Sequence, residues 1–357
     1  MQRALKIFVI VIMFTLVFVL VSIVHLSLIR MNDIKKQASY LNNLDKVYEN
    51  YQAKGHTPFT NKEVGNLPLN EVRFLASHNS YKKTGSAIGR FFVGIGDSFS
   101  EANSLKYSYK PLTEQLMAGI YSLELDIRYR GNEFEVTHVP LVDNSSTSVK
   151  FDLALEEINT FLTYEPNSFP IIIILEIKDD YMVLDPKLKA ITNRELSLLE
   201  ETIINKLGDK VYQPKQLLKS YDSLKASVDS EGYPTIDELA GKVMFVIHAG
   251  KYANIYLEED LNNQVLFTAS YADELNVNSL FVIHNTIDVN AINNLVNNNY
   301  IVRTRVGGTT GYTNEDFKEA ILSNAQILTS DFTVARSDLN KVLYLEDNKY
   351  TIIIKEG

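Results

Sequence analysis

Cysteine and tryptophan are both absent from the 357 residues of this chain. Without cysteine, the protein has no disulfide, no zinc site built from thiolates and no cysteine nucleophile. Positive charge is also scarce, because 44 Asp and Glu residues outnumber 35 Lys and Arg residues and give a formal net charge of -9. Nucleic-acid binding depends on the reverse balance, so we infer no nucleic-acid partner.

Charge is missing almost entirely from a segment near the N-terminus. Between Ile7 and Ile29 the only side chain that can carry a charge is His25. As a helix this segment is about 35 Å long at about 1.5 Å per residue, which exceeds the hydrocarbon core of a bilayer at about 30 Å. Neither an Ala-x-Ala cleavage site nor a lipobox cysteine follows it. We therefore favour an uncleaved transmembrane anchor over residues 1–30, with a cleaved signal sequence as the alternative.

The orientation of this anchor is set only weakly by charge. Arg3 and Lys6 lie on one side of it, and Arg30, Lys35 and Lys36 lie on the other, so the positive-inside rule does not decide. Because the segment before the anchor is short, we expect a membrane-anchored protein in which the bulk of the chain is extracytoplasmic. The alternative is a protein that is secreted after signal cleavage.

Two further regions follow the anchor. Residues 31–67 are polar, and Leu41, Leu44 and Tyr48 recur at helical spacing, which predicts a juxtamembrane helix followed by a linker. Residues 68–357 are expected to form one domain, which their number allows.

Strand and helix patterns alternate through this domain. Short apolar runs predict strands at 72–77, 120–127, 134–137, 171–177, 243–247, 279–283, 300–304 and 326–329. Helical patterns between them predict helices at 112–117, 151–163, 194–207, 289–298 and 315–323. Eight strands that alternate with helices indicate a (β/α)8 TIM-type barrel, whose active site lies at the carboxyl ends of the strands. An open doubly wound sheet is the alternative, but the chain has no glycine-rich dinucleotide or phosphate loop to support it.

Carboxylates lie near the ends of two of these predicted strands. Glu124 and Asp126 alternate with apolar residues in "YSLELDIRY", so both point to the same face of the strand. Glu176 and Lys178 share a face in "IIIILEIKDD", after an almost purely apolar run. Like charges that are buried together are costly without a compensating cation. A polar sheet face or a local ion pair would explain each pattern alone, but together they indicate a cation site.

Histidines follow two other predicted strands. "FLASHNSY" runs from an apolar strand into His78, and "FEVTHVP" ends its strand at His138. A histidine at a strand end is by itself most often a solvated or hydrogen-bonded residue. The oxygen donors near these strand ends suit Ca2+ or Mg2+ rather than zinc. They are Asn79, Glu124, Asp126 and Glu176. Two histidines beside such a site are what general acid-base chemistry on a phosphoester requires.

Six stretches of the domain carry these residues in a fixed order. They are "LPLNEVRFLASHNSYKK" (67–83), "YSYKPLTEQLMAGIYSLELDI" (107–127), "VTHVPLVD" (136–143), "PIIIILEIKDD" (170–180), "DELAGKVMFVI" (237–247) and "VRTR…NAQILTSDF" (302–332). In this combination the chain resembles the calcium-dependent phosphoinositide-type phospholipase C family, particularly its bacterial and fungal branch. The resemblance covers residues 67–334. It departs where Val306 and Gly307 follow Arg305, because the family commonly has Ala-Asp there.

The resemblance implies a Ca2+-dependent phosphodiesterase that acts on phospholipids at a membrane surface. The implied reaction cleaves phosphatidylinositol-type lipids to diacylglycerol and (cyclic) inositol phosphate. One Ca2+ is expected in the set formed by Asn79, Glu124, Asp126 and Glu176. The preference for Ca2+ over Mg2+ comes mainly from the resemblance, since oxygen ligands alone permit either ion.

The resemblance also implies a role for each of the remaining site residues. Glu124 or Glu176 takes the proton of the inositol 2-hydroxyl. His78 stabilises the charge that develops on the phosphate, and His138 protonates the diacylglycerol leaving group. Lys178 and Arg303 are implied contacts of the phosphate or head group, with simple ion pairing as the alternative.

Other functions remain open at this stage. A barrel like glycerophosphodiester phosphodiesterase or sphingomyelinase D shares the use of a metal and two histidines, although the His-Asn and Glu-x-Lys patterns favour phospholipase C. A non-catalytic membrane-anchored barrel is disfavoured, because suitable residues stand at every expected catalytic position. No protein partner is inferred.

One apolar segment follows the first predicted strand, beside the mouth of the expected site. In "SAIGRFFVGIGDSF" (86–99), Phe91, Phe92 and Ile95 either pack down as a loop or short helix, which we favour, or dip into a lipid surface. Ser80, Tyr81 and Asp331 receive no role from the sequence.

Overall fold

The computed structural model describes residues 2–54, 63–308, 311–336, 338–339, 342–345 and 350–353. Within these ranges, eight parallel strands form a closed barrel. In barrel order they are β1 (Val72–Ser77), β2 (Ile120–Arg130), β4 (Ile171–Ile177), β6 (Val243–Ile247), β7 (Phe267–Tyr271), β8 (Phe281–His284), β9 (Ile301–Arg305) and β10 (Ile327–Ser330). The pairing of β1 with both β10 and β2 closes the ring. The predicted (β/α)8 barrel is therefore confirmed.

All eight predicted strands exist, but one of them lies outside the barrel, and one barrel strand was missed. The run at 134–137 belongs to β3 (Glu133–Val136), which pairs antiparallel with the end of β2 and lies outside the barrel. The cause is the length of β2, whose 11 residues extend past the barrel rim before the chain turns back at Gly131 (φ 70°). The missed strand is β7, where Thr268 and Ser270 interrupt the apolar pattern. A buried strand with a polar face gives no continuous apolar run to detect.

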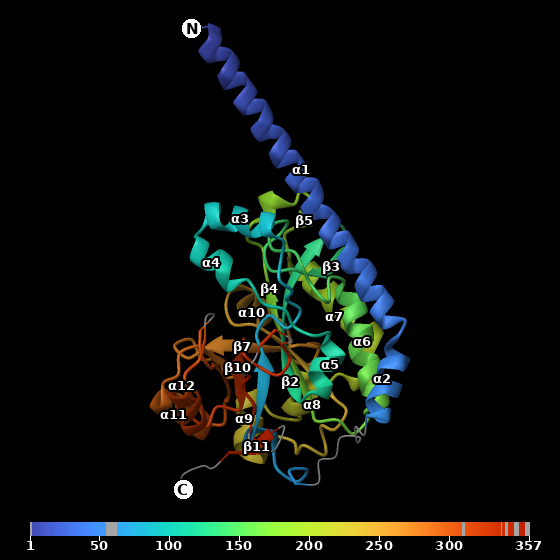
Figure 1. Cartoon of the computed structure of the whole chain (residues 1–357). Helices are drawn as coiled ribbons and strands as arrows, with labels where there is room; N and C mark the ends of the chain where they lie inside the picture. The colour runs from blue at the N-terminus through green and yellow to red at the C-terminus, as the bar shows by residue number, and fades with distance from the viewer. Residues whose placement is uncertain are drawn as a thin grey trace.

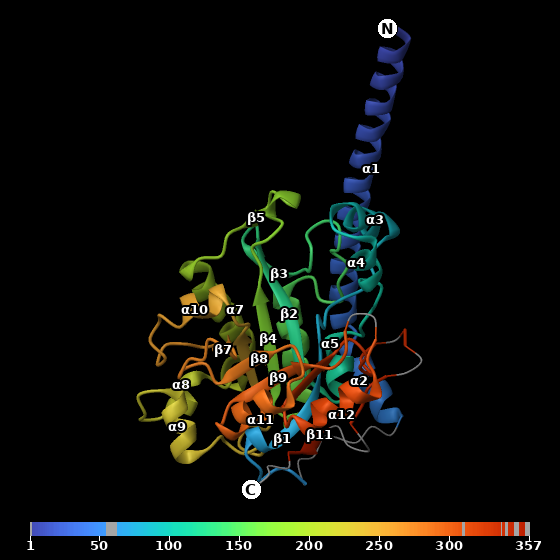
Figure 2. The ribbon, with the colours of Figure 1, turned by 90° about the vertical axis from the view of Figure 1, so that its left-hand side faces the viewer.

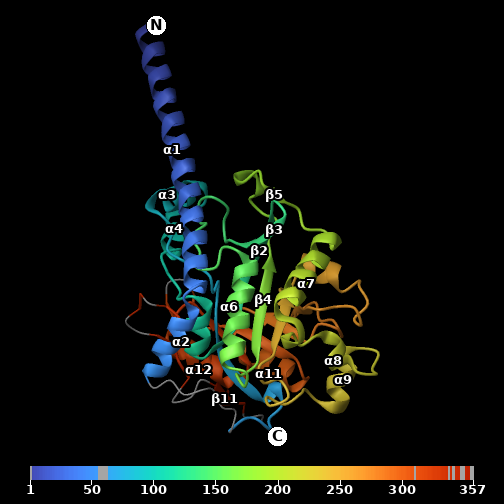
Figure 3. The ribbon, with the colours of Figure 1, turned by 90° about the vertical axis from the view of Figure 1, so that its right-hand side faces the viewer.

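Helices and short strands complete the molecule (Figures 2 and 3). After the first barrel strand the helices are α3 (Ala87–Gly96), α4 (Phe99–Ser104), α5 (Leu112–Met117), α6 (Phe151–Tyr164), α7 (Asn193–Leu207), α8 (Pro214–Leu218), α9 (Leu224–Glu231), α10 (Lys251–Tyr256), α11 (Val289–Asn297) and α12 (Asn314–Leu322). The 3-10 turns are η1 (Leu69–Glu71), η2 (Met182–Leu184) and η3 (Gly208–Lys210), and the remaining strands are β5 (Leu188–Lys189) and β11 (Tyr350–Ile352). The five helices predicted from periodicity match α5, α6, α7, α11 and α12 to within one residue at each end.

The alternation of side chains along the strands separates two apolar layers. Leu123 and Leu125 on β2 belong to the layer under the outer helices, together with Leu155 of α6. Inward-facing residues such as Phe74 and Ile174 form a second cluster inside the barrel. Because side chains alternate along a strand, the next inward positions toward the carboxyl ends are polar. The barrel is thus filled with apolar side chains at one end and opens into a polar site at the other.

Two helices precede the barrel in the chain. They are α1 (Gln2–Leu41) and α2 (Leu44–Ala53). Figure 1 shows α1 as one helix that runs along the body and then projects beyond it. By length and composition α1 can cross a membrane, although a signal sequence near the N-terminus would pass the same test. The expected boundary at residue 30 falls inside this continuous helix. The juxtamembrane helix predicted within 31–67 is its continuation together with α2.

The polar half of α1 is docked on the barrel domain. Asp33 accepts a hydrogen bond from Lys83 at 2.5 Å, and the Gln37 side chain both donates to and accepts from the backbone of Lys150. In α2, Tyr48 is 3% exposed and stacks on Tyr164 of α6 with 4.0 Å between ring centroids. These contacts make residues 30–53 part of the folded domain.

Candidate active site

The loop after β1 carries His78, Asn79 and Ser80, and it is hydrogen-bonded to β2. Ser80 donates its backbone N–H to the carbonyl of Glu124 at 2.9 Å, and its Oγ accepts the Glu124 N–H at 2.8 Å. Asn79, between His78 and Ser80 in the chain, is buried and takes a left-handed backbone conformation (φ 50°), which asparagine tolerates better than most residues. These two hydrogen bonds of Ser80 therefore fix the position of Glu124 along the barrel axis relative to His78. This is a structural role that the sequence did not reveal.

Three carboxylates meet at the carboxyl ends of β2 and β4. Glu124, Asp126 and Glu176 each offer an oxygen, and these oxygens lie within 4.8 Å of one another. Asp126 is fully buried, and both of its carboxylate oxygens lack a well-formed hydrogen bond from the residues that the structure describes. Burial, together with the neighbouring Glu176 and Glu124, raises the pKa of Asp126 to about 6 against the opposing effect of Lys178. Such a cluster of buried oxygens fits a hard divalent cation.

Two basic side chains pair with this cluster. Lys178 Nζ lies 3.0 Å from Glu176 Oε1 and 3.3 Å from Asp126 Oδ2. Arg303 donates to Glu124 at 2.6 Å and also to Asn285. Burial alone would raise the pKa of Glu124, but Arg303 and His78 outweigh it and lower that pKa to about 2. Both cations compensate the charge of the carboxylates.

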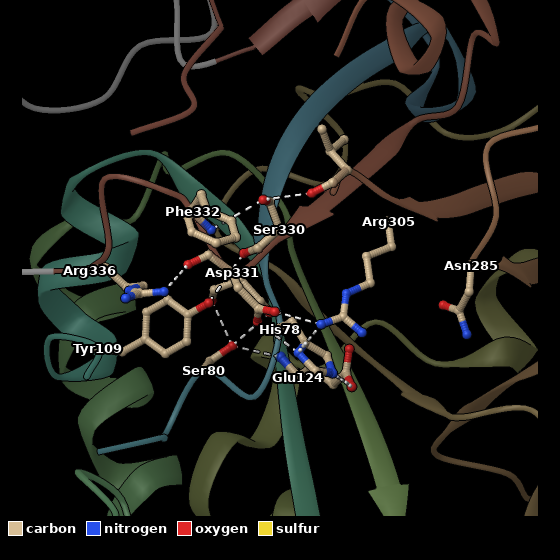
Figure 4. Close-up of polar contacts among 12 residues, drawn as sticks. His78, Ser80, Tyr109, Glu124, Asn285, Arg305, Ser330, Asp331, Phe332 and Arg336 are labelled. Carbon is tan, nitrogen blue, oxygen red and sulfur yellow. Dashed lines mark hydrogen bonds and ion pairs between the residues drawn. The ribbon is translucent and has the colours of Figure 1, made fainter. Parts of the chain in front are cut away.

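His78 is held by an aspartate that follows the neighbouring barrel strand, β10 (Figure 4). Its Nδ1 lies 2.8 Å from Asp331 Oδ1, and Arg305 donates to the other oxygen of Asp331 at 2.5 Å. Burial would raise the pKa of Asp331, but His78 and Arg305 lower it to about 2, so this residue is ionised at neutral pH. The other ring nitrogen, Nε2, faces the carboxylate cluster at 3.7 Å from Glu124 Oε1.

His138 has a similar support although it does not sit on a barrel strand. It follows β3 in a loop, and its backbone carbonyl accepts a hydrogen bond from Arg128. Its Nδ1 lies 2.9 Å from Asp143 Oδ2, and Lys82 donates to Asp143 Oδ1 at 2.5 Å. Burial would raise the pKa of Asp143, but Lys82 and His138 outweigh it and lower that pKa.

Sequence reasoning did not identify Asp143, Asp331, Lys82 or Arg305 as site residues. Asp331 lies two residues beyond inward-facing Thr329 on β10, and this spacing is the one signal that was available. Tyr81 was also left without a role. It is fully buried, and burial together with the charge of Asp126 raises the pKa of its hydroxyl well above the usual value. The Tyr81 ring therefore belongs to the apolar core, and its neutral hydroxyl lies close to Asp126.

The departure from the family pattern after Arg305 has a local explanation. Gly307 has φ 80°, and a Cβ there would lie 2.5 Å from Tyr312 Cβ and 2.6 Å from the carbonyl oxygen of Gly311. An aspartate does not fit this loop as it is folded here.

A (β/α)8 barrel with buried carboxylates and two histidines at its carboxyl end has the architecture and the side chains of a metal-dependent hydrolase. Residues 128–351 match the sequence profile described as "Phosphoinositide phospholipase C, Ca2+-dependent". Because the match spans more than half of the chain, this protein belongs to that family. It is accordingly a phosphoric diester hydrolase with Ca2+-dependent phosphoinositide phospholipase C activity.

Solved structures agree with this fold assignment. A calcium-dependent phosphoinositol-specific phospholipase C from Pseudomonas sp. is similar at 14% identity and a TM-score of 0.60, over 82% of this chain and 98% of that chain. A Ca2+-dependent phosphatidylinositol-specific phospholipase C from Streptomyces antibioticus is similar at 17% identity and a TM-score of 0.55, over 74% and 94%. No curated protein matches the chain. At such identities these structures support the fold alone, and the profile match begins at Arg128, after His78, Asn79, Glu124 and Asp126.

Proposed function

We propose that this protein cleaves phosphatidylinositol-type lipids in the membrane that its own N-terminal helix enters. The observation that supports this best is the buried carboxylate cluster with two histidines beside it, each paired with its own aspartate. The cluster offers a place for the cation, and the two imidazoles offer two separate groups for acid-base chemistry. The products proposed are diacylglycerol and a cyclic inositol phosphate, which the same histidines open with water.

In this proposal the oxygens of Asn79, Glu124, Asp126 and Glu176 hold Ca2+. When bound, the cation neutralises charge on the phosphate and lowers the pKa of the inositol 2-hydroxyl. Glu124 or Glu176 takes the proton of that hydroxyl, whose oxygen then attacks the phosphorus of the same molecule. Proximity within one molecule favours this attack over attack by water.

The histidines have distinct roles in the proposal. Asp331 occupies Nδ1 of His78, which leaves Nε2 on the cluster side to stabilise charge on the phosphate. Asp143 occupies Nδ1 of His138, which leaves Nε2 to protonate the oxygen of the departing diacylglycerol. Lys178 and Arg303 contribute positive charge beside the phosphate once the cation shares the carboxylates with them.

We further propose that α1 is an uncleaved anchor and that the barrel is extracytoplasmic. The apolar half of α1 is exposed, with Leu5, Phe14 and Val21 all more than half accessible, as a lipid-facing helix requires. Protease added to intact cells would then digest the barrel domain, and the membrane fraction would retain it after a carbonate wash. Release of the domain in soluble form would instead indicate signal cleavage.

The substrate proposal is tested by hydrolysis with the full chain in vesicles. Phosphatidylinositol, phosphatidylcholine, sphingomyelin and glycerophosphodiesters are supplied separately, each with Ca2+, Mg2+ or chelator. Release of diacylglycerol from phosphatidylinositol with Ca2+ alone is the expected result. Choline or glycerol release would support the related phosphodiesterase chemistries instead, and cation binding without hydrolysis of any substrate would support a non-catalytic barrel.

A further inference from the structure

A large apolar cavity lies between the N-terminal helix and the mouth of the barrel. It has a volume of about 700 Å³. Its walls come from four segments, which are represented by Ile23 of α1, Phe92 of α3, Leu141 of the loop after β3 and Leu184 of η2. The volume is within the range of about 300–1,000 Å³ that is typical of small-molecule sites. We call this space the α1 cavity.

The α1 cavity is continuous with the active site at one end. His138 and Lys178 both contribute to its lining. His138 is the residue beside which the departing diacylglycerol would lie, and Lys178 pairs with the carboxylate cluster. The inner end is therefore polar and is shared with the catalytic groups, whereas α1 and α3 make the rest largely apolar.

The other end of the α1 cavity lies on the lipid side of the molecule. Phe18 of α1 packs against Phe91 and Phe92 of α3, with 6.4 Å and 6.1 Å between ring centroids. Ile95 and Val183 also line the cavity, and they are 62% and 90% exposed. Figure 1 shows α3 and α4 at the end of the body from which the free part of α1 projects. A membrane that contains the free part of α1 would meet this rim.

We propose that the α1 cavity holds the glycerol backbone and the acyl chains of the lipid that is being cleaved. The lipid would enter sideways along α1 from the membrane, with its acyl chains against α1 and α3 and its phosphodiester between His138 and the carboxylates. This proposal rests on the proposed function and assigns the α1 helix a second role. The helix is then a wall of the substrate site as well as a tether.

The choice of occupant follows from the chemistry of the two ends. The inositol head group is polar on every side and matches the cluster, not the apolar walls. The diacylglycerol part is apolar and must leave toward His138 if that residue protonates it. The shared lining of His138 and the apolar walls satisfies both conditions at once.

The first test fills the cavity and leaves the catalytic groups intact. Ile23→Trp places a larger side chain in the α1 cavity, and Leu20→Trp is the matched control because Leu20 lies three residues earlier on α1 and is 62% exposed. The full chain is assayed on dioleoyl phosphatidylinositol in mixed micelles and on inositol cyclic phosphate, which has no acyl chain. We expect Ile23→Trp to lower kcat/KM at least tenfold for the lipid and to leave the soluble substrate unchanged. Leu20→Trp is expected to change neither rate.

The second test measures occupancy without turnover. The natural chain has no tryptophan, so all tryptophan fluorescence comes from the single tryptophan that is introduced. Leu184→Trp reports on the α1 cavity, and Leu20→Trp reports on the surrounding micelle. With chelator present and a small fraction of phosphatidylinositol brominated on its acyl chains, we expect stronger quenching at position 184 than at position 20.

The results separate the two proposals. If wild type cleaves the lipid and Ile23→Trp cleaves it equally well, the assignment of the cavity is overturned. Equal loss on both substrates also overturns it, because the catalytic groups would then be disturbed. If wild type cleaves no inositol lipid, the proposed function fails, while selective quenching at position 184 by brominated phosphatidylinositol would still support lipid in the cavity. Equal quenching at both positions, or stronger quenching by brominated phosphatidylcholine, would refute it.

Discussion

His138 Nδ1 lies 2.9 Å from Asp143 Oδ2, and the second oxygen of this carboxylate accepts a hydrogen bond from Lys82, whose side chain is fully buried. His78 has the same type of support from Asp331 and Arg305. In both cases a buried carboxylate orients the imidazole and a cation holds the carboxylate. The two histidines are therefore fixed independently, and their aspartates can be tested one at a time.

Asp143→Asn should impair the protonation of the leaving group. Because the imidazole loses the carboxylate that orients it, we expect kcat on phosphatidylinositol to fall at least about 100-fold with little change in KM. An inositol phosphate ester with a nitrophenol leaving group needs no acid, so its rate should fall less than about tenfold. Asp179→Asn is the control, since Asp179 is at the rim and pairs with Lys251 and Tyr252. An equal loss on both substrates would contradict the acid role of His138.

Asp331→Asn should affect the two substrates alike. His78 is assigned to the charge on the phosphate, and that charge develops whatever the leaving group is. We expect kcat to fall by about 100-fold or more on phosphatidylinositol and on the nitrophenyl ester. Both rates are measured at saturating Ca2+ so that a change in cation affinity does not mimic the effect. Full activity on the activated ester would show that His78 acts on the leaving group instead.

Lys178→Met should make stability more dependent on Ca2+. Without the cation, Lys178 compensates Asp126 and Glu176, so its removal leaves buried carboxylates uncompensated. We expect Tm in chelator to fall by several degrees, at roughly 2–4 °C per kcal/mol. Because Ca2+ binds the native state, it should raise Tm more in the variant than in wild type. Differential scanning fluorimetry checks this, with Lys251→Met as the rim control. An unchanged Tm in chelator would argue against this compensation.

Glu157→Gln should change how stability depends on pH. Burial raises the pKa of Glu157 to about 7, although its Oε1 accepts the backbone N–H of Thr113 at 2.8 Å. In the unfolded state the pKa of Glu157 is near 4.5. Between pH 4.5 and about 7 the carboxyl is therefore protonated in the native state and ionised in the unfolded state. Because the unfolded state binds fewer protons in this window, Glu157 makes wild type less stable as pH rises through it. Glutamine keeps an acceptor and carries no charge.

The variant should therefore equal wild type near pH 4.5 and exceed it at pH 8. At about 1.4 kcal/mol per pH unit, the gain in the free energy of unfolding is on the order of 1–3 kcal/mol. Urea unfolding at both pH values measures this difference. Glu156→Gln, on the same helix and partly exposed, is the control. A gain that is the same at both pH values would point to packing and not to titration.

Removal of α2 should destabilise the barrel domain, whereas removal of the apolar part of α1 should not. A chain that begins at Val24 keeps Leu26, Leu44 and Tyr48 buried, but one that begins at Glu63 loses all three. At about 1.5–3 kcal/mol for each large buried side chain, the shorter chain should lose roughly 4.5–9 kcal/mol of unfolding free energy. Denaturant unfolding of both chains is the measurement. Equal stability would mean that residues 30–53 are only a linker.

Local periodicity was sufficient for much of the fold and for the group of three carboxylates. The alternation of Glu124 and Asp126 with leucines, and the apolar run that ends in Glu176, follow from the two-residue repeat of a strand. That repeat depends only on neighbouring residues, so it predicts which face each side chain occupies. The same reasoning gave the correct number of barrel strands, but it counted β3 as one of them. It missed β7, because polar Thr268 and Ser270 interrupt the apolar pattern of that buried strand.

The partners of the two histidines were decided by the tertiary structure. His78 and Asp331 are 253 residues apart and meet because β1 pairs with β10 when the barrel closes. His138 reaches the site through a loop whose position depends on the extension of β2, and the α1 cavity exists because a helix from the start of the chain lies against α3. The sequence by itself indicated the group of three carboxylates, the two histidines and the apolar helix. Which carboxylate orients each histidine, and which surface α1 covers, depend on contacts between distant segments, and local periodicity carries no information about such contacts.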